Sequence, residues 1–363
     1  MNRIKDGQAV IFTKTGEAFR YEKVPLPEPG VGEILIRTEY TTLCRSDLNT
    51  YCGKRTEKSP TILGHEIVGK IQRFGPEAPK KDARGDDLRL GDRVTWAIFA
   101  SDPEDPRSKA GIPQKAADLF KYGHEKVEPN HHLHGGLADY CLLRRNTPVI
   151  RIDESIPLPV SALINCSGAT VAGALRLAGE LKGRRVLITG AGMLGMFATA
   201  MAAAQEPSEL IVADINEERL RTAVGFGATK ILRVPDGRAL DDCFRDNGLT
   251  KADVILDFSG APKVMETSLH CLDIGGIAVW VGATSPQRDL AINAELLVRR
   301  IHTIRGLHNY NADDLVTAVN FMENAGRHFP FQDLVYDGFP LDETEQAFRF
   351  AVESNVFRVG IRL

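Results

Sequence analysis

Short apolar segments, separated by glycine, proline and charged turns, dominate the first 150 residues. The clearest lie at 32–40, 64–75, 91–100 and 137–143. Apolar runs bounded by turn residues are typical of strands. The stretch 101–134 between them is polar and predicts loops. This pattern favours an irregular, antiparallel, β-rich domain up to about residue 150.

From about residue 161 the pattern changes to helices alternating with short apolar runs. These runs are RVLITG, ELIVAD, TKILRV, ADVILDFSG and GIAVWVGA. Such alternation predicts a parallel sheet covered by helices on both faces. After residue 302 follow an amphipathic helix and a short helix-and-strand tail, too little for a third domain. We therefore predict an α/β protein with one domain at 1–160 and 301–363 and a second at 161–300.

Length and charge restrict the classes of partner. The 363 residues suit two domains. The net charge of -3 is spread along the chain without a basic block, so neither nucleic acid nor a membrane surface is an expected partner. We find no signal-peptide pattern, and the apolar stretch 193–204 is too short to cross a bilayer. Scattered cysteines favour reduced thiols, and a cytoplasmic protein is expected.

A glycine motif predicts a dinucleotide site. Gly190, Gly192 and Gly195 form G-x-G-x-x-G directly after a predicted strand and at the start of an apolar helix. That context suits a tight turn holding a pyrophosphate at a helix N-terminus. Asp214 ends the next strand, where a carboxylate binds both ribose hydroxyls and repels a 2′-phosphate, so NAD is favoured over NADP. The alternative is that the glycines serve packing and Asp214 caps a helix.

Cys44 and His65 raise the question of a metal. They lie far apart in sequence and belong to no C-x-x-C cluster, so spacing alone leaves a structural role open for each. The motifs CRSDLN, GHE, NCSGAT and GAGMLG, in this order, resemble the successive signatures of the zinc-dependent medium-chain alcohol dehydrogenases. The resemblance implies a GroES-like catalytic domain, a Rossmann domain, and catalytic zinc ligands at Cys44, His65 and Cys166. Two thiolates and an imidazole leave one tetrahedral position open.

The same resemblance implies roles for further residues. It places Ser46 at the alcohol proton, Asp47 behind the ligand histidine and Glu66 beside the metal. It also assigns residues to the cofactor: Arg45 at the pyrophosphate, Thr170 beside the nicotinamide, and Val281 among the cofactor contacts. The implied reaction is hydride transfer between a zinc-bound alcohol, or the corresponding carbonyl compound, and NAD.

The chain departs from the family at two points. Where many members hold a second, structural zinc with four cysteines, Asp102, Asp105, Ser108 and Ala116 occupy the four positions. This donor set makes a tetrahedral zinc improbable, so one zinc per chain is expected; a weak oxygen-ligated cation is the alternative. At Asn49, some members have a relay histidine. An amide does not accept a proton at neutral pH, so the proton should pass from Ser46 to ribose, water or another group.

The substrate pocket is less defined by the sequence. Along 95–100, Trp96, Ile98 and Phe99 alternate, so only one face can reach a pocket. Lys54 and Arg55 follow the metal segment and suit an anionic substrate, although simple solvated charges are the alternative. His308 is a candidate near the nicotinamide. HTIRGLHNY and GIPQKAADLFKYGHE are similar to zinc dehydrogenases associated with phosphonate catabolism, which makes a phosphonate-bearing alcohol a candidate substrate. The histidine-rich loop 130–136 is interpreted as solvated.

Two other functions stay open. One is a zinc-free NAD(P)H reductase of the same superfamily, and the other is a non-catalytic NAD-binding sensor on the same scaffold. A homo-oligomer, dimer or tetramer, is expected through a sheet edge near residues 275–285.

Overall fold

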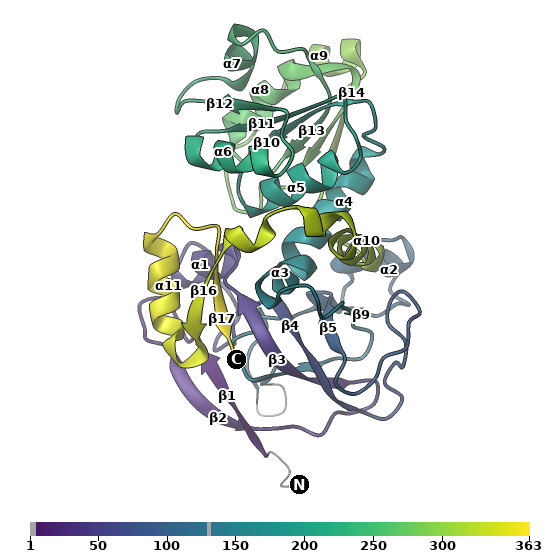
Figure 1. Cartoon of the computed structure of the whole chain (residues 1–363), viewed down its shortest axis with the longest axis vertical. Coiled ribbons are helices and arrows are strands. Elements are labelled where there is room, and N and C mark those ends of the chain that lie inside the picture. The colour runs from purple at the N-terminus through teal and green to yellow at the C-terminus, as the bar shows by residue number, and fades with distance from the viewer. Residues whose placement is uncertain (1–4, 129–131) are drawn as a thin grey trace. The chain divides into compact units, whose positions relative to one another are not determined.

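The computed structural model describes residues 5–128 and 132–363, and the chain divides into two compact units (Figure 1). The first unit contains the described residues up to Cys166 together with Asn311–Glu323 and Phe331–Leu363. The second contains Ser167–Tyr310 and Asn324–Pro330. Residues 130 and 131 of the histidine-rich loop lie outside the described residues.

The first unit is built on a seven-stranded sheet of order β16-β17-β3-β4-β5-β9, with β8 also paired to β3. All its pairings are antiparallel except β16 with β17. The strands are β3 (Ile34–Thr42), β4 (Glu66–Phe74), β5 (Arg93–Trp96), β8 (Tyr140–Leu143), β9 (Val149–Arg151), β16 (Val335–Pro340) and β17 (Arg358–Arg362). Two small sheets pair β1 (Asp6–Ile11) with β2 (Arg20–Pro25) and β6 (Phe99–Ala100) with β7 (Phe120–Lys121).

Apolar side chains on both faces of the large sheet are buried and form hydrophobic cores. Ile34, Ile36, Ile67, Ile71 and Trp96 are buried on one side together with Tyr122. The helices of this unit are α1 (Arg45–Tyr51), α2 (Pro106–Lys109), α3 (Leu158–Leu163), α10 (Ala312–Glu323) and α11 (Thr344–Glu353), with short 3-10 turns η1 (Pro113–Lys115), η4 (Phe331–Leu334) and η5 (Leu341–Glu343).

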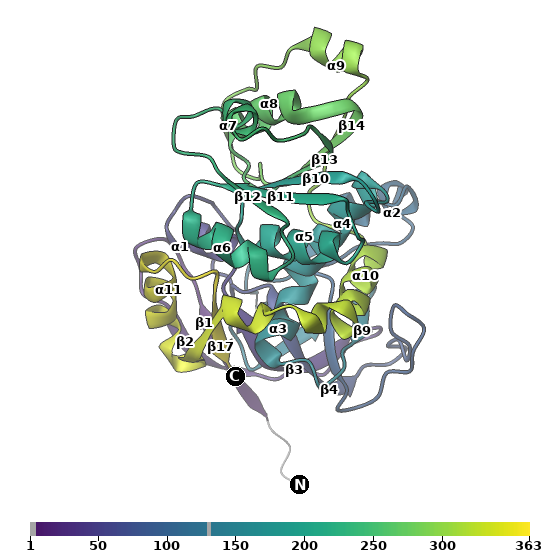
Figure 2. The ribbon, with the colours of Figure 1, turned by 45° about the horizontal axis from the view of Figure 1, so that its top comes forward.

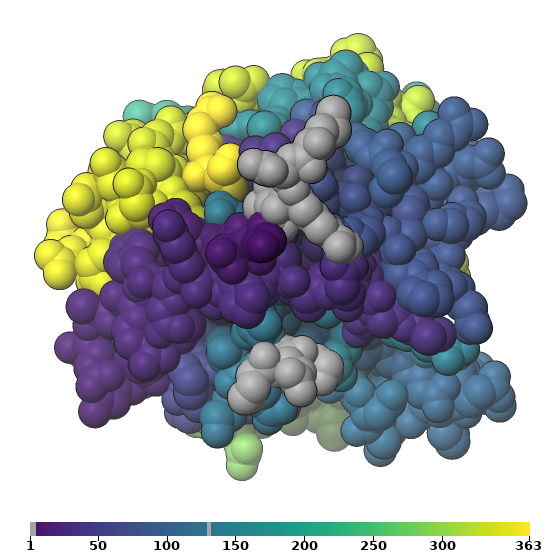
Figure 3. All heavy atoms as spheres, turned by 90° about the horizontal axis from the view of Figure 1, so that it is seen from below, coloured from purple at the N-terminus to yellow at the C-terminus, as the bar shows by residue number. Residues whose placement is uncertain are grey.

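The two ends of the chain meet in this unit. Figure 3 shows the N-terminal residues beside the C-terminal ones on one face. The Glu345 carboxylate on α11 accepts hydrogen bonds from the Phe19 amide at 3.2 Å and from the Tyr51 hydroxyl at 2.8 Å. Phe19 also packs on Phe348, with ring centroids 4.9 Å apart. The C-terminal tail therefore completes the first unit, as its sequence position after the second unit suggested.

The second unit is a parallel sheet of order β12-β11-β10-β13-β14-β15, the doubly wound order 3-2-1-4-5-6 of dinucleotide-binding sheets. Its strands are β10 (Arg185–Thr189), β11 (Glu209–Asp214), β12 (Lys230–Arg233), β13 (Ala252–Asp257), β14 (Leu272–Trp280) and β15 (Thr303–Gly306). The predicted α/β fold class is thereby confirmed.

Helices cover both faces of this sheet. Figure 2 shows α5 and α6 on one side and α7 and α8 on the other. The helices of the unit are α4 (Ala169–Ala178), α5 (Met193–Ala203), α6 (Glu217–Gly225), α7 (Leu240–Asp246), α8 (Pro262–Cys271) and α9 (Ala294–Arg300), with the turn η3 (Ala325–His328). The strands between them are buried on both faces, which explains their uninterrupted apolar runs.

Two expectations about the end of this sheet are corrected. The first domain was expected to resume at residue 301, but Thr303–Gly306 forms β15 and pairs with β14. This strand is short and half-exposed, so it carries no apolar run that would reveal it. An edge was also expected near 275–285. Because β14 pairs with both β13 and β15, the edge strand is β15.

One helical segment is longer than the apolar stretch 193–204 named in the sequence. Leu158–Ala178 is long and apolar enough to cross a bilayer, but 89% of its most apolar window is buried inside the structure. A core helix has the same composition, so packing accounts for this run. A π-helical turn, η2 (Ile164–Gly168), interrupts it.

Candidate metal and cofactor sites

Three sulfur and nitrogen ligand atoms converge in the first unit. They belong to Cys44, which precedes α1, to His65, which precedes β4, and to Cys166, on the π-helical turn. The three atoms lie within 4.8 Å of one another. Among the described residues, no other group of three or more histidine, cysteine and acidic side chains converges in this way. Two thiols and an imidazole at this spacing fit a catalytic zinc with an open fourth position.

His65 is held from behind by a fully buried carboxylate. Asp47 Oδ1 lies 3.4 Å from His65 Nδ1, and its two oxygens accept backbone hydrogen bonds from Cys44 at 2.9 Å and Gly64 at 3.2 Å. Asn165 donates to the His65 carbonyl at 3.0 Å. Such contacts fix the orientation of a ligand histidine and leave Nε2 for the metal. Asp47 thus lies where its expected role requires.

Close packing separates the protonation states of the three ligand groups. The hydrogen bond between the two thiols lowers the pKa of Cys44 well below its ordinary value and raises that of Cys166. Burial favours a neutral His65, but the charge of Asp47 and its hydrogen bond outweigh burial and raise the pKa of His65. Without metal, these groups therefore favour a Cys44 thiolate, a Cys166 thiol and a charged imidazole.

The Glu66 carboxylate is bound by Arg358. Its oxygens accept from Arg358 Nε at 2.9 Å and Nη2 at 3.1 Å, and from the Thr42 hydroxyl at 2.6 Å. Arg358 Nη2 also lies 3.6 Å from Cys44 Sγ. The expected position of Glu66 beside the metal is thus occupied by a buried ion pair, and Glu66 is not one of the converging ligand groups. The sequence carried no signal for Arg358.

Ser46 lies at the ligand histidine, and the backbone of Asn49 lies at the end of the same helix. The Ser46 hydroxyl is 3.5 Å from His65 Nε2. Asn49 lies one turn further along α1, where its carbonyl accepts the amides of Lys54 at 2.8 Å and Arg55 at 3.1 Å. Its backbone therefore closes the turn after α1.

A second buried histidine contacts His65. The rings of His65 and His124 are 5.0 Å apart. His124 Nδ1 lies 3.0 Å from Glu57 Oε1, and Arg55 pairs with the same oxygen at 2.5 Å. Burial lowers the pKa of His124 despite the bond to Glu57, so Nδ1–H of a neutral ring donates to Glu57. Neither His124 nor Glu57 carries a signal in the sequence, because nothing in their spacing links them to Cys44.

The substrate candidates lie in different surroundings. Lys54 is exposed, whereas Arg55 is engaged by Glu57. Ile98 is only 3% exposed, and Trp96 belongs to the buried core, which supports the packing role for Trp96. His308 is exposed and belongs to the second unit. Lys54, Arg55 and Ile98 thus belong to the first unit and His308 to the second, and their role at a substrate pocket stays a prediction.

In the lobe that was compared with the structural-zinc site, carboxylates bond to the backbone. Asp105 caps α2 through the Arg107 amide at 2.7 Å and also accepts the Ala117 amide at 3.0 Å. Asp102 accepts the Glu104 amide at 2.9 Å. Ser108 lies within α2 and Ala116 is buried. Asp105 thus cross-links two ends of the lobe without a metal, and the lack of a zinc here stays a prediction.

The glycine loop has the shape of a dinucleotide cradle. Gly190 has φ +94°, and a Cβ there would lie 2.7 Å from the Ser259 nitrogen. A Cβ at Gly195 would lie 2.0 Å from the Gly190 carbonyl oxygen. Gly192, the N-cap of the eleven-residue helix α5, has open space where a Cβ would be. Neither side-chain packing nor the backbone conformation requires a glycine at position 192. Close approach of a pyrophosphate to the backbone would require one.

Asp214 lies at this cradle. Its oxygens accept the amides of Ala191 at 2.6 Å and Asn216 at 2.7 Å. Val281 follows β14 and donates its amide to the Asp257 carbonyl at 2.9 Å. Thr170 is buried on α4. These residues belong to the second unit, whereas the exposed Arg45 begins α1 in the first.

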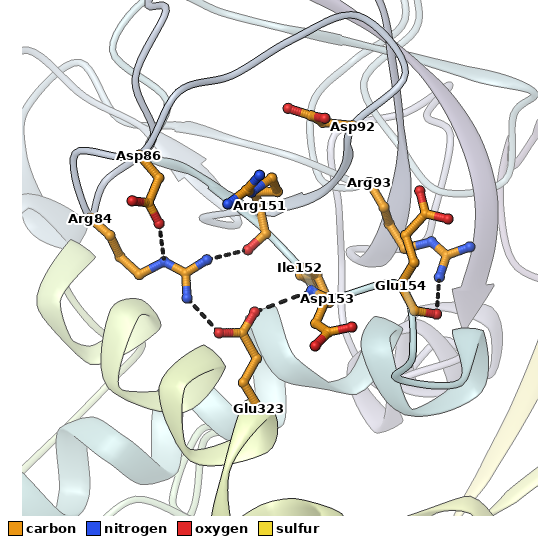
Figure 4. A pocket seen from close by; sticks show the side chains of 9 residues that line it. All are labelled: Arg84, Asp86, Asp92, Arg93, Arg151, Ile152, Asp153, Glu154 and Glu323. Atoms are coloured by element: carbon orange, nitrogen blue, oxygen red, sulfur yellow. Dashed lines mark hydrogen bonds and ion pairs between the residues drawn. The ribbon is translucent and has the colours of Figure 1, made fainter.

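A separate cavity of about 440 Å³ in the first unit is lined mainly by charged side chains (Figure 4). Arg84 donates to Glu323 at 2.6 Å and to the Arg151 carbonyl at 2.7 Å. Glu323 accepts the Asp153 amide at 3.1 Å. The cavity contains none of the predicted site residues. Its contacts attach α10 to β9, so we assign it a structural role.

Comparison with known proteins places this geometry in a family. Residues 30–154 match the alcohol dehydrogenase GroES-like domain, and residues 194–324 match the zinc-binding dehydrogenase family. An L-threonine 3-dehydrogenase from Xanthomonas oryzae pv. oryzae is 25% identical over 345 residues, covering 94% of this chain and 95% of the relative.

Solved structures agree on the fold. An alcohol dehydrogenase from Thermotoga maritima is 24% identical with a TM-score of 0.90, covering 98% of this chain and 99% of that one. A structure described as a short chain alcohol dehydrogenase from Escherichia coli CFT073, complexed with NADH, is 19% identical with a TM-score of 0.85, covering 99% and 100%. With both domain families matched in order along the chain, the protein belongs to the zinc-dependent medium-chain alcohol dehydrogenase family.

Proposed function

We propose that this protein is a zinc-dependent oxidoreductase that transfers a hydride between a small polar alcohol, or the corresponding carbonyl compound, and NAD. The observation that carries this proposal is the convergence of Cys44, His65 and Cys166 within 4.8 Å. This donor set is the one expected for a zinc that keeps a position open for substrate.

The chain's own residues divide the work of orientation and proton transfer. When bound, zinc supplies Lewis-acid polarisation of the alcohol oxygen, and NAD supplies the hydride acceptor. Asp47 orients His65 through Nδ1. Ser46, 3.5 Å from His65 Nε2, is placed to take the hydroxyl proton. Because the Asn49 amide cannot accept that proton, Ser46 would pass it on to water or another acceptor.

The cofactor preference rests on the glycine cradle and Asp214. A ribose bound beside Gly190–Ala191 would meet the Asp214 carboxylate, which accepts hydroxyl protons and repels a 2′-phosphate. NAD is therefore the proposed cofactor.

The substrate proposal is a small polar alcohol. Relatives named L-threonine 3-dehydrogenase cover nearly the whole chain, which makes L-threonine one compound for the first panel. A phosphonate-bearing alcohol, suggested by the sequence resemblance, is a second. The cytoplasmic location likewise stays a prediction.

The test combines metal content with turnover. We expect about one zinc per chain in protein purified without added zinc. Cys166→Ser should lower that content, and Cys52→Ser, at an exposed free thiol, should not. With NAD, Ser46→Ala should reduce kcat more than zinc content. A zinc-free protein would favour the zinc-free reductase, and zinc with NAD binding but no turnover of any alcohol would favour the sensor.

We also propose a homo-oligomer that pairs through β15. This strand forms the edge of the parallel sheet, and the preceding residues Val298 and Ile301 are 76% and 71% exposed. An open edge flanked by apolar side chains favours strand pairing between copies. Light scattering should give a mass of at least two chains, and Ile301→Lys should reduce it.

A further inference from the structure

A strand beside the metal ligands carries a lysine, Lys121, that forms no ion pair with any carboxylate of the described residues. In the ladder between β6 and β7, Lys121 lies directly opposite Phe99. Its neighbours Phe120 and Tyr122 turn the other way, with Tyr122 completely buried in the core. Lys121 is therefore fixed to the opposite face of a short, well-anchored strand.

The residues after Lys121 lead directly to the metal ligands. Tyr122 donates its amide to the Ile98 carbonyl at 3.0 Å. A Cβ at Gly123 would lie 2.6 Å from the Gly64 oxygen and 3.3 Å from His65 Cβ, so this backbone packs on the ligand segment. His124 then contacts the His65 ring. Lys121 is thus three residues from a side chain that touches a ligand.

The charges around Lys121 do not neutralise it. Within the described part of the chain, no carboxylate forms an ion pair with its ammonium group. Glu57 is engaged by Arg55 and His124, and Glu125 is paired with Lys58 at 2.5 Å. Partial burial lowers the pKa of Lys121, and the nearby charges of Lys115 and Arg55 lower it further, whereas the charges of Glu57 and Glu125 oppose that shift.

A half-buried cation that forms no ion pair is costly unless an anion joins it. We propose that Lys121, with Arg55 and Lys115 beside it, binds an anionic group of the substrate, a carboxylate, phosphate or phosphonate, whose alcohol end reaches the metal ligands. The idea deepens the proposed function and rests on it for the chemistry. Anion binding itself does not depend on turnover. The site shares Arg55 with the one expected at Lys54 and Arg55, but it is centred on Lys121 and not on the exposed Lys54.

Inorganic phosphate is the first probe, titrated calorimetrically into the full-length, zinc-supplemented protein at constant ionic strength. Lys121→Ala should weaken phosphate binding about tenfold or more, the effect of losing one charge-assisted contact. Lys121→Arg should retain binding, and Lys126→Ala, at an exposed lysine of the same segment, should not change it. Lys121→Met, which keeps the apolar stem, guards against a folding defect in the alanine variant.

Kinetics provide the second readout. The ratio of KM for 2-hydroxyethylphosphonate to KM for propan-1-ol should rise about tenfold in Lys121→Ala. Equal changes for both alcohols, or equal phosphate binding by Lys121→Ala and Lys126→Ala, would overturn the proposal. If wild type binds phosphate through Lys121 but oxidises no alcohol, the anion site stands and the proposed function fails. If wild type oxidises propan-1-ol but Lys121→Ala leaves phosphate binding intact, the proposed function stands and the anion site at Lys121 fails.

Discussion

Arg358 and Glu66, 292 residues apart in the sequence, form a bidentate ion pair at 2.9 and 3.1 Å beneath Cys44. Both side chains are buried, with exposures of 8% and 0%. Burial raises the pKa of Glu66, and the Arg358 charge opposes that rise. Removing one partner would leave the other charge buried and alone.

Arg358→Met should therefore destabilise the protein by about 3–5 kcal/mol. The matched control is Arg362→Met, on the same strand, whose ion pair with Asp337 is 58% exposed on the arginine side; it should cost less than about 1 kcal/mol. Urea unfolding at pH 7 measures both. Equal losses would mean that the buried pair contributes no more than a surface one.

Zinc binding should release protons. In the metal-free site, the raised pKa values of Cys166 and His65 favour their protonated forms, whereas the lowered pKa of Cys44 favours its thiolate. Metal ligation requires two thiolates and a neutral imidazole, so about two protons should leave per zinc at pH 7. The number should fall as pH rises above the pKa of His65 or Cys166. Indicator-dye titration of chelator-treated protein measures it, and no release at pH 7 would contradict the assignment.

Asp214 should decide cofactor choice through its charge. Asp214→Asn keeps an acceptor oxygen for the backbone amides of Ala191 or Asn216 but loses the repulsion of a 2′-phosphate. The ratio of kcat/KM for NADP to that for NAD should rise roughly tenfold. Asp214→Ala, which loses both backbone contacts, should lower kcat/KM with either cofactor. An unchanged ratio in Asp214→Asn would show that the carboxylate does not meet the ribose.

The lobe at Asp105 should loosen in acid. Hydrogen bonds from the Ala117 and Arg107 amides lower the pKa of Asp105 below its ordinary value of 3.8. A lowered folded pKa means that this stabilisation is present above pH 3.8 and is lost as pH falls through the folded value. Cleavage of the lobe by pepsin should accelerate over that window in the wild type. Asp105→Asn keeps an acceptor without the titration, so its cleavage rate should lack this step; identical profiles would contradict the role.

Much of the fold could be predicted because its strongest signals are local. The buried strands β10, β11 and β13 are five or six mainly apolar residues long; Gly190 follows β10, and β11 and β13 each end in aspartate. The glycine motif follows the first of them. β15 has only four residues, two of them exposed. It exists through pairing with β14, and no property of its own sequence announces that pairing.

The residues of the candidate site likewise fall into those that the sequence identified and those that it did not. Cys44, His65 and Cys166 were reached through short motifs that resemble those of a known family. Arg358, Glu57 and His124 lie outside those motifs, and their contacts join segments 292 and 67 residues apart. A charge pattern along the chain does not reveal such pairs, because each member alone reads as an ordinary polar residue. Trp96 is the opposite case. Its position along the sequence predicted a place in the wall of the substrate pocket, but its side chain is buried in the hydrophobic core.

The π-helical turn at Ile164–Gly168 has a consequence for how this chain can vary. A π turn contains one residue more than the α-helix around it. Deleting one residue there would let the helix become regular, and each helical residue turns the backbone by about 100°. The Cys166 thiol would then no longer face Cys44 and His65. A single-residue deletion or insertion on this turn would therefore displace the third ligand even if Cys166 itself were kept.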